Sequence, residues 1–174
     1  MNTDKTEIRS IGAKEAQIKA LIARAQAFDG GKVEYRHTRS YGEDVIELTY
    51  AEDISRRVSE DVLRVFAEGL EESIYALDGT HLPAQLVWLL KLRDKRISVA
   101  ESFTGGGIAR KITSVSGASE VYFEGLNTYS ELSKIKRLGV SEYTLKTFGA
   151  VSEQTAYEMA AGLMAPGDCD ICIT

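Results

Sequence analysis

A serine shortly before three consecutive glycines is the feature of this sequence that most clearly indicates chemistry. It lies in the stretch Ala100-Glu101-Ser102-Phe103-Thr104-Gly105-Gly106-Gly107, between a short apolar run and a helical pattern. Glycines let the backbone approach a ligand closely, and free N–H groups at a helix start can hold an anion or an oxyanion. The stretch therefore fits either a phosphate-binding loop or a nucleophilic serine with its oxyanion hole.

Spacing alone makes this motif only weakly specific. It is neither G-x-x-x-x-G-K-[ST] nor G-x-G-x-x-G, and it lacks the leading glycine of a G-x-S-x-G elbow. A glycine-rich turn between a strand and a helix is also a common way to pack the helix closely on a sheet. Both a functional and a purely structural interpretation of Ser102 remain open at this point.

A nucleophilic Ser102 needs a base. His37 alternates with charged residues in a predicted hairpin, and His81 lies at the start of a predicted helix. We expect exposed or capping roles for both, so a Ser-His-Asp arrangement has little support. A lysine can act as base when burial or a nearby cation lowers its pKa. The spacing does not choose among the lysines.

The two cysteines form a C-x-x-C motif, Cys169 and Cys172. A zinc site needs two further ligands, and the two histidines are far away in sequence. A thioredoxin-type motif lies at the start of a helix, whereas residues 169–174 have the pattern of a strand. We interpret both residues as thiols of the core.

The elements around Ser102 alternate between strands and helices. Ser152 is a good helix cap and Pro83 is expected to open a helix. The alternation predicts an α/β layer fold with a largely parallel sheet, in which ligands bind at the carboxyl ends of strands. The predicted elements are a strand over 97–100, a helix over 108–115, extended segments over 121–123 and 126–129, helices over 134–138 and 152–164, and a last strand over 169–174.

The first 78 residues predict a small module of α+β type. Apolar residues from Ile8 to Ala25 recur at helical spacing. Two alternating runs, 33–37 and 45–50, with a turn-like link between them predict a hairpin. A second, longer helix is expected from Ile54 onwards and ends near Asp78-Gly79. We therefore expect two domains, residues 1–78 and residues 79–174.

Composition excludes several classes of protein. The chain has 174 residues, 44% of them hydrophobic, and a net charge of −5, as in an ordinary packed protein without the basicity of a nucleic-acid binder. No run approaches the roughly 20 apolar residues that span a bilayer, and the polar start does not resemble a signal peptide. We expect a cytoplasmic protein that binds neither nucleic acid nor membrane.

The region from residue 97 onwards resembles the C-terminal domain of the CinA (competence/damage-inducible) family, the nicotinamide-nucleotide amidases. The resemblance implies a three-layer α/β/α domain. The hairpin and long helix upstream are similar to the small KH-like segment that precedes this domain in full-length members. Six ordered blocks of sequence carry the resemblance to the C-terminal domain: Ala100–Gly106; Gly117–Ser119 with Phe123 and Gly125; Thr128-Tyr129-Ser130 with Lys134; Leu138-Gly139-Val140; Phe148–Ser152; and Ala156, Met159-Ala160 and Gly162.

The resemblance also implies a reaction. Ser102 would attack the carboxamide carbon of nicotinamide mononucleotide, releasing ammonia and, after hydrolysis of the acyl-enzyme, nicotinate mononucleotide. Lys134 would be the general base, and Tyr129 would lie beside it and order the hydroxyl–amine contact. The partner is a small pyridine nucleotide, and neither a metal nor a cofactor is called for. The substrate-binding loop would include Thr104, Gly105 and Gly106.

The sequence departs from the family in three places. Phe103 stands where the family usually has cysteine, and Glu131 and Leu132 replace the usual Asn-Glu pair. The family also continues past the last strand with a further loop, more strands and a basic residue. We therefore expect a domain that is incomplete at its C-terminus and a homo-oligomer that covers the exposed edge. Two alternatives remain: an inactive relative that acts as a nucleotide-binding or protein-interaction module, and a fragment of a longer enzyme.

Overall fold

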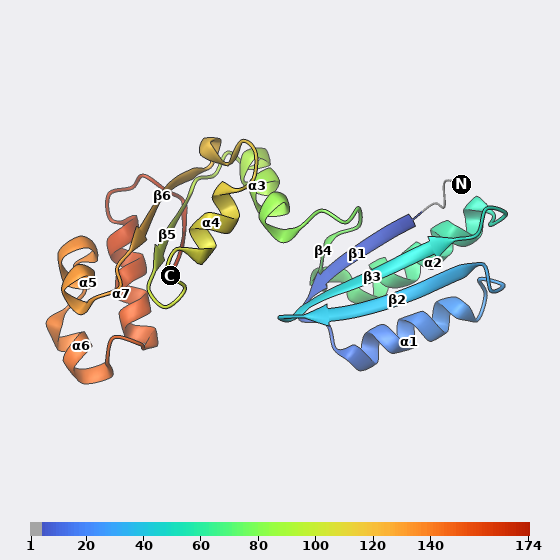
Figure 1. Cartoon of the computed structure of the whole chain (residues 1–174), viewed down its shortest axis with the longest axis horizontal. Coiled ribbons are helices and arrows are strands. Elements are labelled where there is room, and N and C mark those ends of the chain that lie inside the picture. The colour runs from blue at the N-terminus through green and yellow to red at the C-terminus, as the bar shows by residue number, and fades with distance from the viewer. Residues whose placement is uncertain (1–4) are drawn as a thin grey trace. The chain divides into compact units, whose positions relative to one another are not determined.

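The chain forms two compact units, Met1–Gln85 and Leu86–Thr174 (Figure 1). The computed structural model describes residues 5–174. Both units combine helices with strands, which confirms the expected mixed α/β fold class. Over the described residues, no helix is both long enough and apolar enough to cross a bilayer.

In its described part, the N-terminal unit is a four-stranded antiparallel sheet with two helices. The strand order is β2-β3-β1-β4, and with the chain order βαββαβ this is the ferredoxin-like arrangement. The KH-like detail expected from the resemblance is not confirmed. The elements are β1 (Lys5–Ile11), α1 (Glu15–Gln26), β2 (Val33–Ser40), β3 (Glu43–Tyr50), α2 (Arg56–Leu70) and β4 (Ile74–Ala76), with a short 3-10 helix (Glu71–Ser73) before β4.

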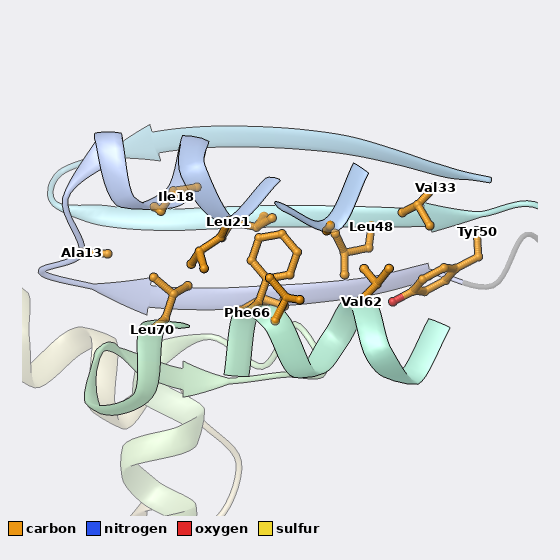
Figure 2. Close-up of a cluster of buried hydrophobic side chains, with 13 residues drawn as sticks. Ala13, Ile18, Leu21, Val33, Leu48, Tyr50, Val62, Phe66 and Leu70 are labelled. Carbon is orange, nitrogen blue, oxygen red and sulfur yellow. The ribbon is translucent and has the colours of Figure 1, made fainter. Parts of the chain in front are cut away.

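The predicted hairpin is confirmed as β2 and β3. The two strands pair from Val33 opposite Tyr50 to Ser40 opposite Glu43, so Tyr41 and Gly42 form the two-residue turn that matches the natural twist of paired strands. On β3, alternate residues are buried, and they form the sheet side of the core. Figure 2 shows how α1 and α2 supply the other side with Ile18, Leu21, Val62, Phe66 and Leu70.

The predicted first helix is wrong at its start. Residues Lys5–Ile11 form strand β1, and α1 begins only at Glu15. Ile8 is completely buried, but it lies opposite Ile46 of β3 and not on a helix. The three-residue spacing of Ile8 and Ile11 fits a helix, yet β1 pairs with both β3 and β4, and these long-range pairings decide its structure.

The second helix of this unit is shorter than predicted. It ends at Leu70, and Ile74–Ala76 form strand β4 at the edge of the sheet. Arg9 lies opposite Ala76 and Ser10 opposite Ile74 in this pairing. The β-branched and aromatic residues of the segment favour a strand, so the helical spacing up to Ser73 was misleading.

The C-terminal unit, which is fully described, is built on a three-stranded parallel sheet. Strand order β6-β5-β7 makes β5 the central strand, and both of its neighbours run parallel to it, as predicted. The helix opened by Pro83 is α3, which crosses the boundary between the units. The elements are α3 (Leu82–Leu92), β5 (Ile97–Glu101), α4 (Gly107–Thr113), a 3-10 helix (Ala118–Glu120), β6 (Tyr122–Asn127), α5 (Glu131–Leu138), α6 (Glu142–Phe148), α7 (Glu153–Met164) and β7 (Ile171–Ile173).

Two separate apolar clusters cover the central strand. Ile97 and Val99 of β5 pack in a cluster with residues of α3 and α4. Ala100 packs in a second cluster with Leu138 at the end of α5, Leu145 of α6, and Met159 and Leu163 of α7. Because neighbouring residues of a strand point to opposite faces, helices cover both faces of the sheet. Sequence reasoning missed α6, a short helix with few buried residues.

Gly162 lies where α7 packs against the end of α5. A Cβ added here would lie 1.9 Å from the carbonyl oxygen of Leu138. We expect Gly162→Ala to lower the free energy of unfolding by about 1–3 kcal/mol, because either helix must shift to relieve the overlap. Urea unfolding measures the change, and Ala161→Ser at the exposed neighbouring position is the control. Equal midpoints for the two variants would contradict this packing.

Candidate active site

Ser102 directly follows the central strand of the C-terminal unit. Every residue of β5 is buried, and Ser102 is the first partly exposed position after it. The turn that follows is closed by a hydrogen bond from the Gly105 amide to the carbonyl of Ser102, 3.1 Å. Gly106 ends the turn with φ of +94°, a backbone conformation that side chains with a Cβ rarely adopt. The serine is thus held at the carboxyl end of the sheet, where ligands of open α/β sheets bind.

The structure brings Lys134 to Ser102 across 32 positions of sequence. The Nζ atom of Lys134 lies 3.0 Å from Oγ of Ser102 and donates a hydrogen bond of 2.6 Å to the carbonyl of Thr128. Lys134 lies in α5, which Ser130 caps by accepting a hydrogen bond from the amide of Ser133. Only 1% of Lys134 is exposed, so the amine is enclosed beside the hydroxyl.

Burial lowers the pKa of the Lys134 amine, and the nearby Glu131 carboxylate only partly opposes this shift. Loss of hydration disfavours the ammonium form, while the neutral amine keeps a lone pair that can accept a proton. The neighbouring atom that carries a transferable proton is Oγ of Ser102. The pair therefore has the arrangement of a hydroxyl nucleophile and an amine base.

A hydrogen bond between backbone atoms connects the segment that carries Ser102 with the carbonyl group that binds Lys134. The amide of Thr128 donates to the carbonyl of Glu101, 2.9 Å. Ser102 is the next residue after Glu101, and the Thr128 carbonyl accepts from Lys134. The positions of the hydroxyl and the amine are thus tied together through the ends of β5 and β6.

Sequence reasoning missed the role of Glu101, whose carboxylate occupies the start of α4. Its two oxygens accept hydrogen bonds from the amides of Ile108 and Ala109, at 2.9 and 2.8 Å, and the residue is 4% exposed. Burial alone would raise the pKa of Glu101, but the bonds from Ala109, Thr104, Ile108 and Gly106 outweigh it and the pKa is lowered. An acidic residue beside a helix start was the available signal.

This arrangement corrects the expectation that the amides at the helix start are free for a ligand. Those of Ile108 and Ala109 are bound by Glu101. Among residues 5–174, the amides that remain without a hydrogen bond next to the nucleophile are those of Phe103 and Thr104. The Ser102 amide also makes no hydrogen bond in the described chain, so these amides are the candidate donors for an oxyanion formed at Ser102.

A cavity of about 320 Å³ opens beside Ser102. It is bounded by the loop after β5 and by the segment that leads into α7. Most of its side chains are apolar, which is typical of small-molecule sites with a few polar groups. Its lining residues are Ala100, Glu101, Ser102, Phe103, Thr104, Ile108, Ala150, Val151, Ser152, Ala156, Met159 and Thr174.

Other predicted site residues lie in different surroundings. Tyr129 is 75% exposed, and within the described chain no hydrogen bond joins it to Ser102 or Lys134. Thr104 lines the cavity, whereas Gly105 and Gly106 shape the turn and do not line it. The structure thus brings together Ser102, Lys134 and Thr104, and it leaves the ring of Tyr129 at the surface.

The histidines and cysteines lie outside this arrangement. His37 is partly buried and its Nε2 lies 2.7 Å from Oδ1 of Asp44 in the N-terminal unit, so the expected exposed or capping role is corrected to that of a hydrogen-bond partner of Asp44. His81 is exposed. Cys169 and Cys172 are free thiols, one buried and one half-buried, as predicted for the core.

Comparison with known proteins finds relatives of the C-terminal unit and of most of the chain. Residues 79–174 match the family described as the CinA C-terminal domain. A CinA-like protein from Kosmotoga olearia is 41% identical over 134 residues, which are 75% of this chain and 32% of that protein. A CinA-like protein from Chlorobium limicola is 34% identical over 173 residues, 97% of this chain and 40% of the relative. The chain spans less than half the length of these curated relatives.

A solved structure is similar to part of this chain. It is that of the competence/damage inducible protein CihA from Agrobacterium tumefaciens, with a TM-score of 0.51 and 38% sequence identity. The match covers 52% of this chain and 55% of that chain.

Proposed function

The chain belongs to the family of CinA C-terminal domains, and from this premise we propose that it hydrolyses the carboxamide of nicotinamide mononucleotide to nicotinate mononucleotide and ammonia. The observation that carries the proposal is the 3.0 Å separation between Nζ of Lys134 and Oγ of Ser102, a residue that lines a cavity. A nucleophile within hydrogen-bond reach of its base is the diagnostic arrangement of covalent hydrolases.

The first step forms the acyl-enzyme. Neutral Lys134 takes the proton of the Ser102 hydroxyl while Oγ attacks the carboxamide carbon. The carbonyl oxygen becomes an oxyanion, and the free amides of Phe103 and Thr104 donate hydrogen bonds to it. The Lys134 ammonium, held by the Thr128 carbonyl, then gives its proton to the amide nitrogen. The C–N bond breaks, and ammonia leaves.

The second step releases the product. A water molecule attacks the ester carbon while the neutral amine of Lys134 accepts the water's proton. The same proton then passes to Oγ of Ser102 as the ester bond breaks, and nicotinate mononucleotide leaves with the enzyme restored. One buried amine serves both steps, which explains why a single Lys134 beside Ser102 suffices as base and acid. The ordering role of Tyr129 stays a prediction.

Product analysis tests the proposal. The purified chain incubated with nicotinamide mononucleotide is expected to release ammonia and nicotinate mononucleotide in equal amounts, as measured by an ammonia assay and chromatography. Nicotinate mononucleotide offered as substrate is the control and must give no ammonia. A rise in the melting temperature with the nucleotide but without ammonia would contradict hydrolysis and favour the nucleotide-binding alternative, because a ligand of the native state stabilises it by mass action. If the nucleotide neither raises the melting temperature nor releases ammonia, both hydrolysis and the nucleotide-binding alternative are contradicted.

A further inference from the structure

The acyl part of any substrate of Ser102 must bind close to Phe103. A reacting carbonyl carbon lies about 3 Å from the attacking oxygen. The group attached to that carbon therefore lies in the cavity or at its rim. Phe103 is the residue next to Ser102, lines this cavity, and is 90% exposed. The aromatic side chain of Phe103 is thus open to a ligand in the cavity that Ser102 also lines.

The part of the cavity formed by the segment before α7 and by α7 itself is apolar as well. Val151 lines the cavity and is 92% exposed, and Ala150, Ala156 and Met159 continue the apolar lining. Covering exposed apolar surface with a ligand is favourable, and the exposed ring of Phe103 can stack on a flat aromatic group. The lining therefore favours a planar aromatic acyl group.

The charge of the cavity selects further among aromatic groups. Of the lining residues the structure describes, Glu101 is the one that carries a charge, and no lysine, arginine or histidine lines the cavity. The Glu101 carboxylate is 4% exposed and is fixed by two backbone amides. A fixed anion favours a cationic ligand over a neutral one. A flat, positively charged ring therefore matches both the apolar lining and the negative charge of Glu101.

We infer that Phe103 determines specificity in this site: its ring is the face against which the cationic pyridinium ring of a carboxamide substrate stacks, with Glu101 as the nearby anion. Cations bind the faces of aromatic rings through the ring quadrupole, and this attraction grows when water is excluded. The inference rests on the proposed function, since it places the ring of the same substrate.

Two ligands that differ only in their ring test this assignment. Nicotinamide mononucleotide has a cationic pyridinium, and its dihydro form has a neutral ring on the same ribose phosphate. On the full chain carrying Ser102→Ala, which cannot form the acyl-enzyme, calorimetry is expected to show about fivefold to tenfold tighter binding of the oxidised form. Adding Phe103→Leu, apolar but without a π face, is expected to reduce that ratio to about twofold or less. Phe103→Tyr, which keeps a ring, is expected to retain the ratio.

The outcomes separate the inference from the proposed function. An unchanged ratio in Phe103→Leu, or no binding of either ligand to the Ser102→Ala chain, would overturn the role of Phe103. Ammonia release by the chain with Ser102 intact is measured separately. If ammonia is released but the ratio of the two affinities does not depend on Phe103, the proposed hydrolysis stands and the role of Phe103 is rejected. If the ratio depends on Phe103 but no ammonia is released, the proposed hydrolysis is rejected and the role of Phe103 in binding the ring stands.

Discussion

Replacing Ser102 by alanine is expected to reduce the rate of ammonia release from nicotinamide mononucleotide by about a thousandfold or more, because it removes the oxygen atom that would form the acyl-enzyme. The fold should be unaffected. Oγ of Ser102 accepts a hydrogen bond from Lys134, and in the variant the Lys134 amine still donates to the carbonyl of Thr128. Steady-state ammonia assays measure the rate, and the nucleotide should still bind.

Ser98→Ala is the matched control for this prediction. Ser98 lies in the same strand, β5, and is 1% exposed. In the described chain its Oγ makes no hydrogen bond, so its loss removes no contact of the site. We expect Ser98→Ala to keep full activity. If Ser102→Ala keeps more than about a tenth of the wild-type rate, covalent catalysis by this hydroxyl is wrong.

The location of Ser102 could be predicted because it depends on its immediate neighbours. An apolar run that becomes β5 precedes it, and a turn that requires Gly106 follows it. Both signals are local. The helix cap at Ser152 is local too, and it is confirmed by the hydrogen bond from the amide of Thr155 to Oγ of Ser152. Strand ends and caps of this kind can be predicted from one sequence.

The contact between Lys134 and Ser102 could not be predicted in this way. It depends on the pairing of β5 with β6 and on a bond between backbone atoms of Glu101 and Thr128, which any residue types could form. The family resemblance named Lys134, whereas spacing did not. The resemblance also placed Tyr129 beside the amine, and the structure has this ring largely in solvent.

Strand β1 and the hydrogen bonds of the Glu101 carboxylate could not be predicted from the sequence for other reasons. Ile8 and Ile11 have a helical spacing, and on strand β1 Ile8 is buried while Ile11 is exposed, so the pairings with β3 and β4 decide the structure against the local pattern. Glu101 could be recognised as acidic, but its carboxylate contacts amides seven and eight residues later, across a turn whose shape is not encoded in any short pattern. For β1 the deciding contacts are distant in the chain, whereas the contacts of Glu101 are local and depend on the exact shape of the turn.

Replacing Lys134 by methionine is expected to lower the rate of ammonia release by about a hundredfold to ten-thousandfold, the usual contribution of a general base. Methionine has a similar length and no charge, so it can fill the space of a side chain that is 1% exposed. Ser102 keeps its place after β5, but its hydroxyl loses its proton acceptor. The ammonia assay used for Ser102→Ala measures this loss, and Lys136→Met, an exposed position on the same helix, is the control that should keep full activity.

The same variant is expected to change how stability depends on pH. Burial lowers the pKa of Lys134 in the folded chain, while the unfolded chain keeps the ordinary value of about 10.4. Between these two pKa values the unfolded state binds more protons, so the free energy of unfolding of the wild type rises with pH throughout this interval. Below the folded-state pKa both states are protonated and this contribution is constant. Lys134→Met has no such group and should lack this rise.

Urea unfolding at a series of pH values from neutral to about 10.4 distinguishes this prediction from a general loss of stability. Removing the amine also leaves the Thr128 carbonyl without its donor, which costs about 1–3 kcal/mol at every pH and shifts the curve without changing its slope. Only the pKa difference changes the slope. Lys136→Met should follow the wild-type slope, because Lys134 is intact in it. Parallel curves for wild type and Lys134→Met would show that the buried amine stays protonated, and a protonated amine cannot be the base that activates Ser102.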